Sequence, residues 1–125
     1  MSRILIIDDD PDLVDSVCRL MAEKKHEMLV AYSGEEGIIT AREQKPDAII
    51  LDVMMPGKDG YSVCKELKAD PCCRAIPVLL LTAVVLQIPS GTYTMRNGME
   101  TEADDYIDKP VAPDELVSRV EALLT

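Results

Sequence analysis

The chain has 125 residues, of which 47% are hydrophobic and 29% charged, and its formal net charge is −10. This size and composition indicate one soluble globular domain over residues 1–125, and the negative charge argues against direct nucleic-acid binding, because it repels phosphates. No apolar run approaches about 18 residues and no cleavable leader pattern opens the chain. These absences argue against secretion and membrane contact and favour a cytoplasmic protein.

The chain begins with the pattern of a strand followed by a helix. Ile4–Ile7 is a short, continuously apolar run, which predicts a strand buried on both faces. Asp10 followed by Pro11 predicts a helix start, because the acid can cap the first turn and proline suits the first helical position. Apolar residues then recur at three- and four-residue spacing: Leu13, Val14, Val17, Leu20 and Met21.

A second strand and helix follow with the same organisation. Met28–Tyr32 predicts the strand, and Ser33 followed by Glu36 forms a capping-box pattern that predicts the helix. That helix is expected to end near Pro46. We expect His26, the single histidine, to be a solvent-exposed residue in the loop between the first helix and the second strand.

The middle of the chain repeats the pattern once more. Ala48–Asp52 predicts a third strand, and residues 56–60 form a turn-rich cluster. A third helix is expected to end near Asp70, before a fourth strand over Val78–Thr82. The inward face of that helix carries Val63, Cys64 and Leu67.

The last third of the chain is less regular. Pro89 and Gly98 interrupt residues 84–101, so we expect a fourth helix there to be short or displaced. A short strand is predicted near Tyr106–Ile107, and a final helix after Pro113. The apolar face of the final helix carries Leu116, Val117, Val120, Leu123 and Leu124.

Alternating strands and helices predict the α/β class. With right-handed crossovers, we expect a doubly wound, five-stranded parallel sheet in the flavodoxin-like order 2-1-3-4-5, with helices on both faces. In such a sheet the carboxyl ends of the strands meet at one edge, where ligands bind.

Three of the predicted strands end on acid or hydroxyl residues. The first runs into Asp8, Asp9 and Asp10, the third ends at Asp52, and the fourth ends at Thr82. Carboxylates from two strands would meet at the same edge, which is costly unless a cation joins them. The sequence therefore predicts a metal-dependent site around Asp52.

Four segments together resemble the receiver domain of two-component response regulators, the CheY-like family. The resemblance covers essentially the whole chain, and its motifs occur in the right order on the right elements. The segments are Arg3–Leu13, Leu51–Gly60, Leu80–Ala83 and Asp104–Pro110.

The resemblance implies that Asp52 accepts a phosphoryl group, and that Mg²⁺ assists. A carboxylate can attack phosphorus to form an acyl phosphate. Asp9 and Asp52 match the direct metal ligands of the family, with the backbone carbonyl of Met54 as a third. Asp8 matches an acid that acts through a coordinated water. Asp10 is expected to cap the first helix instead.

The same resemblance assigns three further residues. Lys109 matches the lysine that pairs with the phosphoacceptor and then with a phosphoryl oxygen. Thr82 would donate its hydroxyl to another phosphoryl oxygen. Tyr106 would be the switch residue, whose ring turns inward when Asp52 is phosphorylated.

The partners implied are a sensor histidine kinase or a phosphotransfer protein, and a downstream protein target or output domain. A homodimer through the fourth helical position, the fifth strand and the last helix is also implied. We do not expect turnover of an external metabolite. Two alternatives stay open, a phosphorylation-independent interaction module and a Mg²⁺-dependent aspartyl phosphohydrolase. The phosphohydrolase typically needs a second acid where Met54 stands.

The chain departs from the family pattern in one region. The segment between Thr82 and Tyr106 is longer than in typical receivers, and Glu102 stands where glycine is usual. Glycine there would end a helix in a left-handed conformation. We expect residues 84–101 to be remodelled, which affects the output surface and not the acidic site.

Overall fold

The computed structural model describes residues 2–55, 57, 59–82, 103–108 and 112–124. Its elements in chain order are β1 (Arg3–Ile7), α1 (Pro11–Glu23), β2 (Glu27–Ala31), α2 (Gly34–Gln44), β3 (Ala48–Asp52), α3 (Gly60–Ala69), β4 (Val78–Thr82), β5 (Asp105–Asp108) and α5 (Pro113–Leu123). Within these residues, no helix has both the length and the apolar character that crossing a membrane requires.

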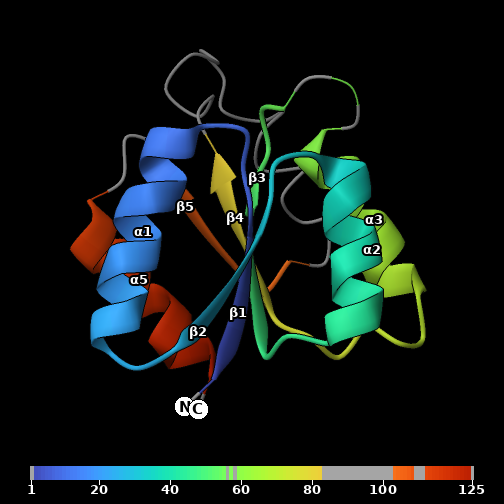
Figure 1. Cartoon of the computed structure of the whole chain (residues 1–125). Coiled ribbons are helices and arrows are strands. Elements are labelled where there is room, and N and C mark those ends of the chain that lie inside the picture. Colours follow the sequence, from blue (N-terminus) through green and yellow to red (C-terminus); the bar gives the residue numbers. More distant parts are fainter. Residues whose placement is uncertain (1, 56, 58, 83–102, 109–111, 125) are drawn as a thin grey trace.

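The five strands form one parallel sheet in the order β2-β1-β3-β4-β5. Helices α1 and α5 cover one face of this sheet, and α2 and α3 cover the other (Figure 1). The predicted doubly wound α/β fold and its strand order are therefore confirmed. Because all strands run in the same direction, the residues that follow them collect at one edge.

The core consists of two aliphatic clusters, one on each face of the sheet. In β1, Leu5 and Ile7 belong to the cluster under α2 and α3, whereas Ile4 and Ile6 belong to the cluster under α1 and α5. Side chains of a strand alternate between faces, so a strand covered on both sides must be apolar at every position. This explains why the strand signal in the sequence is continuous and not alternating.

The helix starts follow the capping signals in the sequence. The side chain of Asp10 accepts a hydrogen bond from the Asp12 N–H at 3.0 Å. Ser33 Oγ accepts from the Glu36 N–H at 3.2 Å, and Glu36 Oε1 accepts from the Tyr32 N–H at 3.0 Å. The bonds from Asp12 and Glu36 satisfy first-turn N–H groups that have no partner inside the helix, and the bond from Tyr32 ties the residue before the Ser33 cap to the first turn of α2. Both predicted helix starts are confirmed.

Two local predictions are wrong. Strand β2 begins and ends one residue earlier than predicted, and Tyr32 follows it with half of its surface exposed. His26 does lie in the loop between α1 and β2, but it is not solvated: its side chain is 11% exposed, and Nε2 lies 3.1 Å from Glu121 Oε2 on α5. The fourth helix predicted over residues 84–101 falls outside the described residues.

Candidate functional site

The sheet brings the predicted acidic residues to one edge. Asp8 and Asp9 follow β1, and Asp52 is the last residue of β3. Ile7 of β1 is paired with Leu51 of β3, so the residues that follow them in the two strands are neighbours. This parallel register makes Asp8 and Asp52 adjacent, although they are far apart in the sequence.

The three carboxylates form a compact cluster. One carboxylate oxygen from each of Asp8, Asp9 and Asp52 lies within 4.8 Å of the other two. Asp8 is 0% exposed and Asp52 is 1% exposed, whereas Asp9 is exposed to solvent. Two ionised carboxylates at this separation repel by roughly 3 kcal/mol at an effective dielectric constant of about 20. A divalent cation would offset this repulsion, and the all-oxygen donor set fits Mg²⁺.

Backbone N–H groups fix the orientation of the two buried carboxylates. Asp8 Oδ1 accepts from the Asp10 N–H at 3.0 Å, and Asp52 Oδ1 accepts from the Met54 N–H at 3.2 Å. The main chain at Asp8 is itself held by a bond from its N–H to the Ala31 carbonyl, at 3.1 Å. These contacts hold both side chains in place, and pre-positioned groups favour catalysis.

The other predicted site residues are only partly described. Met54 exposes 56% of its surface beside the cluster, and the role of its carbonyl as a metal ligand stays a prediction. Thr82 is the last residue of β4, one position beyond Leu81, which pairs with Asp52. The backbone of Thr82 therefore lies at the same edge of the sheet as Asp52. The role of its hydroxyl stays a prediction. Lys109 lies outside the described residues.

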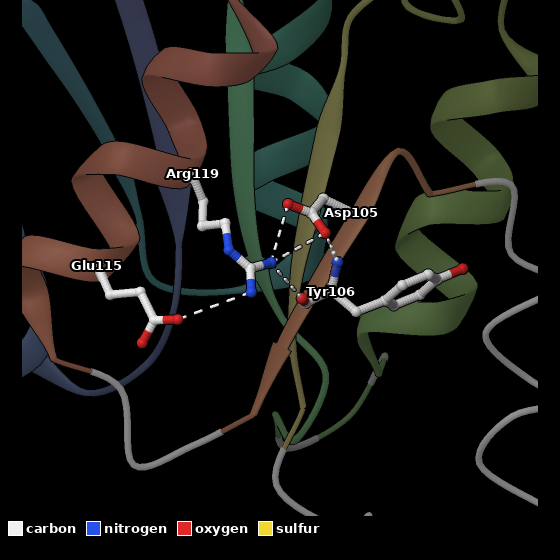
Figure 2. Close-up of polar contacts among 4 residues, drawn as sticks. All are labelled: Asp105, Tyr106, Glu115 and Arg119. Carbon is white, nitrogen blue, oxygen red and sulfur yellow. Dashed lines mark hydrogen bonds and ion pairs between the residues drawn. The ribbon is translucent and has the colours of Figure 1, made fainter.

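Tyr106 is half-buried on β5 and packs against the cluster under α2 and α3. Figure 2 shows its ring pointing away from α5 and toward the α3 side of the sheet. Its backbone is held from the other side: Arg119 Nη1 donates to the Tyr106 carbonyl at 3.1 Å and to both Asp105 carboxylate oxygens, also at 3.1 Å (Figure 2). Sequence reasoning missed Arg119. The available signal was its position four residues after Glu115, an acid–base pair on one helix face.

The comparisons with known proteins agree with this geometry. The family model described as the response regulator receiver domain matches residues 4–121. The DNA-binding response regulator MtrA of Mycolicibacterium smegmatis is 38% identical over 122 residues, which cover 98% of this chain and 50% of that protein. The chain thus spans about half the length of this curated relative.

Solved structures of receiver domains also resemble this chain. The receiver domain of a signal transduction histidine kinase from Syntrophus aciditrophicus superposes with a TM-score of 0.87 at 35% identity, covering 99% of this chain and 90% of that one. The receiver domain of the sensor histidine kinase PA1611 from Pseudomonas aeruginosa has a TM-score of 0.82 at 26% identity, covering 98% and 97%. That structure has a magnesium ion coordinated in its active site cleft.

Proposed function

The chain belongs to the response regulator receiver domain family, and we propose that its Asp52 accepts a phosphoryl group from a phosphohistidine on a partner protein. The observation that carries this proposal is the buried Asp52 carboxylate, clustered with Asp8 and Asp9 within 4.8 Å at the ligand-binding edge of the sheet. A cation bound at this edge would offset the repulsion between the clustered carboxylates, and a carboxylate oxygen of Asp52 can act as a nucleophile.

The proposed transfer is a direct displacement at phosphorus. An Asp52 carboxylate oxygen attacks, the new O–P bond forms while the P–N bond to the donor imidazole breaks, and the imidazole nitrogen keeps the electron pair and is protonated. The Met54 N–H holds Oδ1 and so orients the carboxylate for attack. Most of the rate enhancement in phosphoryl transfer comes from such positioning and from charge neutralisation.

Receiver domains bind Mg²⁺ in an acidic site, and we assign Asp8, Asp9 and Asp52 as the residues that hold it here. When bound, Mg²⁺ would neutralise charge on the oxygens of the transferred group. Solvent-exposed Asp9 is the ligand best placed to meet an incoming ion, whereas Asp8 and Asp52 are already desolvated. The backbone carbonyl of Met54 completes the proposed protein ligand set.

Signalling would follow from a shift between two conformations. In the proposed active state, Thr82 and Lys109 contact the phosphoryl group and Tyr106 turns inward. The half-buried position of Tyr106 on β5, next to β4, supports a ring that can change its burial. The bond from Arg119 to the Tyr106 carbonyl offers a physical connection from this residue to α5.

Response regulators interact with histidine kinases and with output domains. For this chain we propose a sensor histidine kinase or phosphotransfer protein as donor, and an output domain or separate protein as target, acting in the cytoplasm. We also propose that it converts no external metabolite, and that it can pair with a second copy through β5, α5 and the fourth helical position. The relative MtrA is a DNA-binding regulator. The net charge of −10 suggests that any contact with DNA is made by residues outside this chain.

Intact-mass measurement after incubation with acetyl phosphate and Mg²⁺ tests the proposal. The wild-type chain should gain the mass of one phosphoryl group, and Asp52→Asn should gain none. Asp59→Asn is the matched control, because Asp59 is an exposed acid in the following loop and an amide oxygen can still cap α3. A mass gain in Asp52→Asn would reject Asp52 as the acceptor. The absence of a mass gain in both the wild type and the control would reject it as well.

A further inference from the structure

The start of α3 lies directly against the main chain of Asp52. A Cβ atom placed on Gly60 would lie 2.6 Å from Val53 Cα and 2.9 Å from the carbonyl carbon of Asp52, and it would also overlap the Asp52 carbonyl oxygen. Real Cβ atoms do not approach other atoms so closely, and all of these atoms belong to the backbone. No side-chain rotation can relieve the contact, so any residue other than glycine must move the main chain.

This close approach allows a hydrogen bond from Gly60 that is linked, through one peptide group, to the Asp52 carboxylate. The Gly60 N–H donates to the Val53 carbonyl at 3.0 Å. That carbonyl belongs to the same planar peptide group as the Met54 N–H, which donates to Asp52 Oδ1 at 3.2 Å. The orientation set at one end of the rigid peptide is therefore transmitted to the other end.

Other contacts in this region hold the main chain and side chain of Val53 in place. Its N–H donates to the Leu81 carbonyl of β4 at 3.0 Å, and its side chain is 3% exposed. Asp59 Oδ1 accepts from the Ser62 N–H at 2.8 Å and fixes where α3 begins. The Val53–Met54 peptide, which holds the Asp52 carboxylate, is thus anchored to the first residue of α3, and the peptide just before it is anchored to β4 through the Val53 N–H.

We infer that Gly60 is a positioning residue for the phosphoacceptor: its missing side chain lets α3 dock on the Asp52 main chain and orient the peptide that holds the Asp52 carboxylate. This rests on the proposed function of Asp52. The effect of a substitution is then not limited to stability. A displacement of the carboxylate by about 1 Å can slow a reaction roughly a hundredfold.

The test compares Gly60→Ala with Gly57→Ala. Gly57 lies in the same loop with φ of +79°, and a Cβ there would meet nothing within 4 Å, so its substitution strains the loop without pressing on Asp52. Both variants are incubated with acetyl phosphate and Mg²⁺ below their unfolding temperatures, and the ¹H–¹⁵N signal of the Met54 amide is recorded without phosphodonor. We expect Gly60→Ala to slow phosphorylation by roughly tenfold or more and to shift the Met54 signal. Gly57→Ala should stay within about twofold of the wild type, with the Met54 signal little changed.

Equal phosphorylation rates in the two variants, or an unmoved Met54 signal in Gly60→Ala, would overturn the inference. If Gly60→Ala does not fold, the amide signals of the Asp52→Asn variant test the inference instead. That change weakens a charge-assisted bond to the Met54 N–H, so the Gly60 amide signal should move more than the Gly57 amide signal. Equal movement of the two would again overturn the inference. Because the amide signals need no phosphodonor, they decide the role of Gly60 even if the wild-type chain is never phosphorylated on Asp52.

Discussion

Acidic residues are arranged in opposite ways at the two ends of the parallel strands, which we call the carboxyl edge and the amino edge of the sheet. At the carboxyl edge, Asp8, Asp9 and Asp52 converge on one another within 4.8 Å. At the amino ends, acidic residues pair with basic ones: Lys68 Nζ lies 3.1 Å from Asp104 Oδ2, and Arg3 Nε lies 3.5 Å from Glu27 Oε1. Clustered like charges repel one another, whereas paired opposite charges attract. This contrast agrees with the proposed role of the carboxyl ends of the strands as the reaction site, and it indicates that the ion pairs at the amino ends stabilise the fold.

The amino edge is best illustrated by Lys68. Only 9% of its side chain is exposed, and Nζ donates to the Ile76 carbonyl at 2.9 Å and to the Arg74 carbonyl at 3.3 Å in addition to Asp104. Asp104 Oδ2 also accepts from the Val78 N–H at 2.8 Å. One ammonium group therefore joins the end of α3, the start of β4 and the residue before β5.

The largest expected effect is on Mg²⁺ affinity, when Asp8→Asn removes one carboxylate from the cluster at the carboxyl edge. The amide keeps the acceptor for the Asp10 N–H but removes one buried charge. Mg²⁺ affinity should fall by roughly ten- to a hundredfold. Without Mg²⁺ the variant should be at least as stable as the wild type, because like-charge repulsion is relieved.

Thermal unfolding with and without Mg²⁺ measures both effects. The wild type should gain about 2.7 kcal/mol of unfolding free energy at a Mg²⁺ concentration one hundred times its dissociation constant. Asp8→Asn should gain far less at the same concentration. A wild-type chain whose unfolding does not respond to Mg²⁺ would contradict the assignment of this edge as a metal site.

An intermediate effect is expected at the amino edge from Lys68→Met. The substitution keeps the aliphatic volume but leaves two carbonyls and Asp104 without their shared donor, so the free energy of unfolding should fall by about 1–3 kcal/mol. Lys65, an exposed lysine on the same helix, is the matched control, and Lys65→Met should change it by less than about 0.5 kcal/mol. Urea unfolding measures both values. Equal losses in the two variants would show that Lys68 has no special role.

The smallest effect is expected from Asp70→Asn, at the end of α3. The pKa of the Asp70 carboxyl is lowered, first because the Cys72 N–H donates to it and then because the Arg42 guanidinium donates to it. A lowered native-state pKa means that this carboxylate stabilises the fold above the unfolded-state pKa of about 3.9, and that the stabilisation is lost as pH falls through the native value. Asp70 has only 14% of its side chain exposed, but 53% of the Arg42 side chain is exposed, so salt and solvent screen the pair and keep the effect small.

Urea unfolding at pH 7 and at pH 3 measures this contribution. The Asn variant should be less stable than the wild type at pH 7, and the difference should shrink below about pH 4. A difference that stays constant or grows on acidification would show that the Asp70 charge does not stabilise the fold.

Local sequence rules predicted most of the framework, for a physical reason. A strand such as Ile4–Ile7 is apolar at every position because it is covered on both faces, and Asp10 caps α1 through bonds to the next few residues. Both features depend on short-range geometry. The carboxylate cluster was also predictable, since parallel strands must end at one edge once the alternation of strands and helices is known.

What the tertiary structure alone decided are contacts between distant residues whose types carry no local signal. His26 and Glu121 are brought together by the packing of α1 against α5, Lys68 and Asp104 by the docking of α3 beside the sheet, and Gly60 and Asp52 by the close approach of a helix start to a strand end. The amino-acid sequence by itself determined the order of elements, the caps of α1 and α2 and the acidic residues at the carboxyl ends of the strands, because those follow from periodicity and hydrogen bonding along the chain. The distances that orient the Asp52 carboxylate depend on three-dimensional packing, which only the folded chain provides.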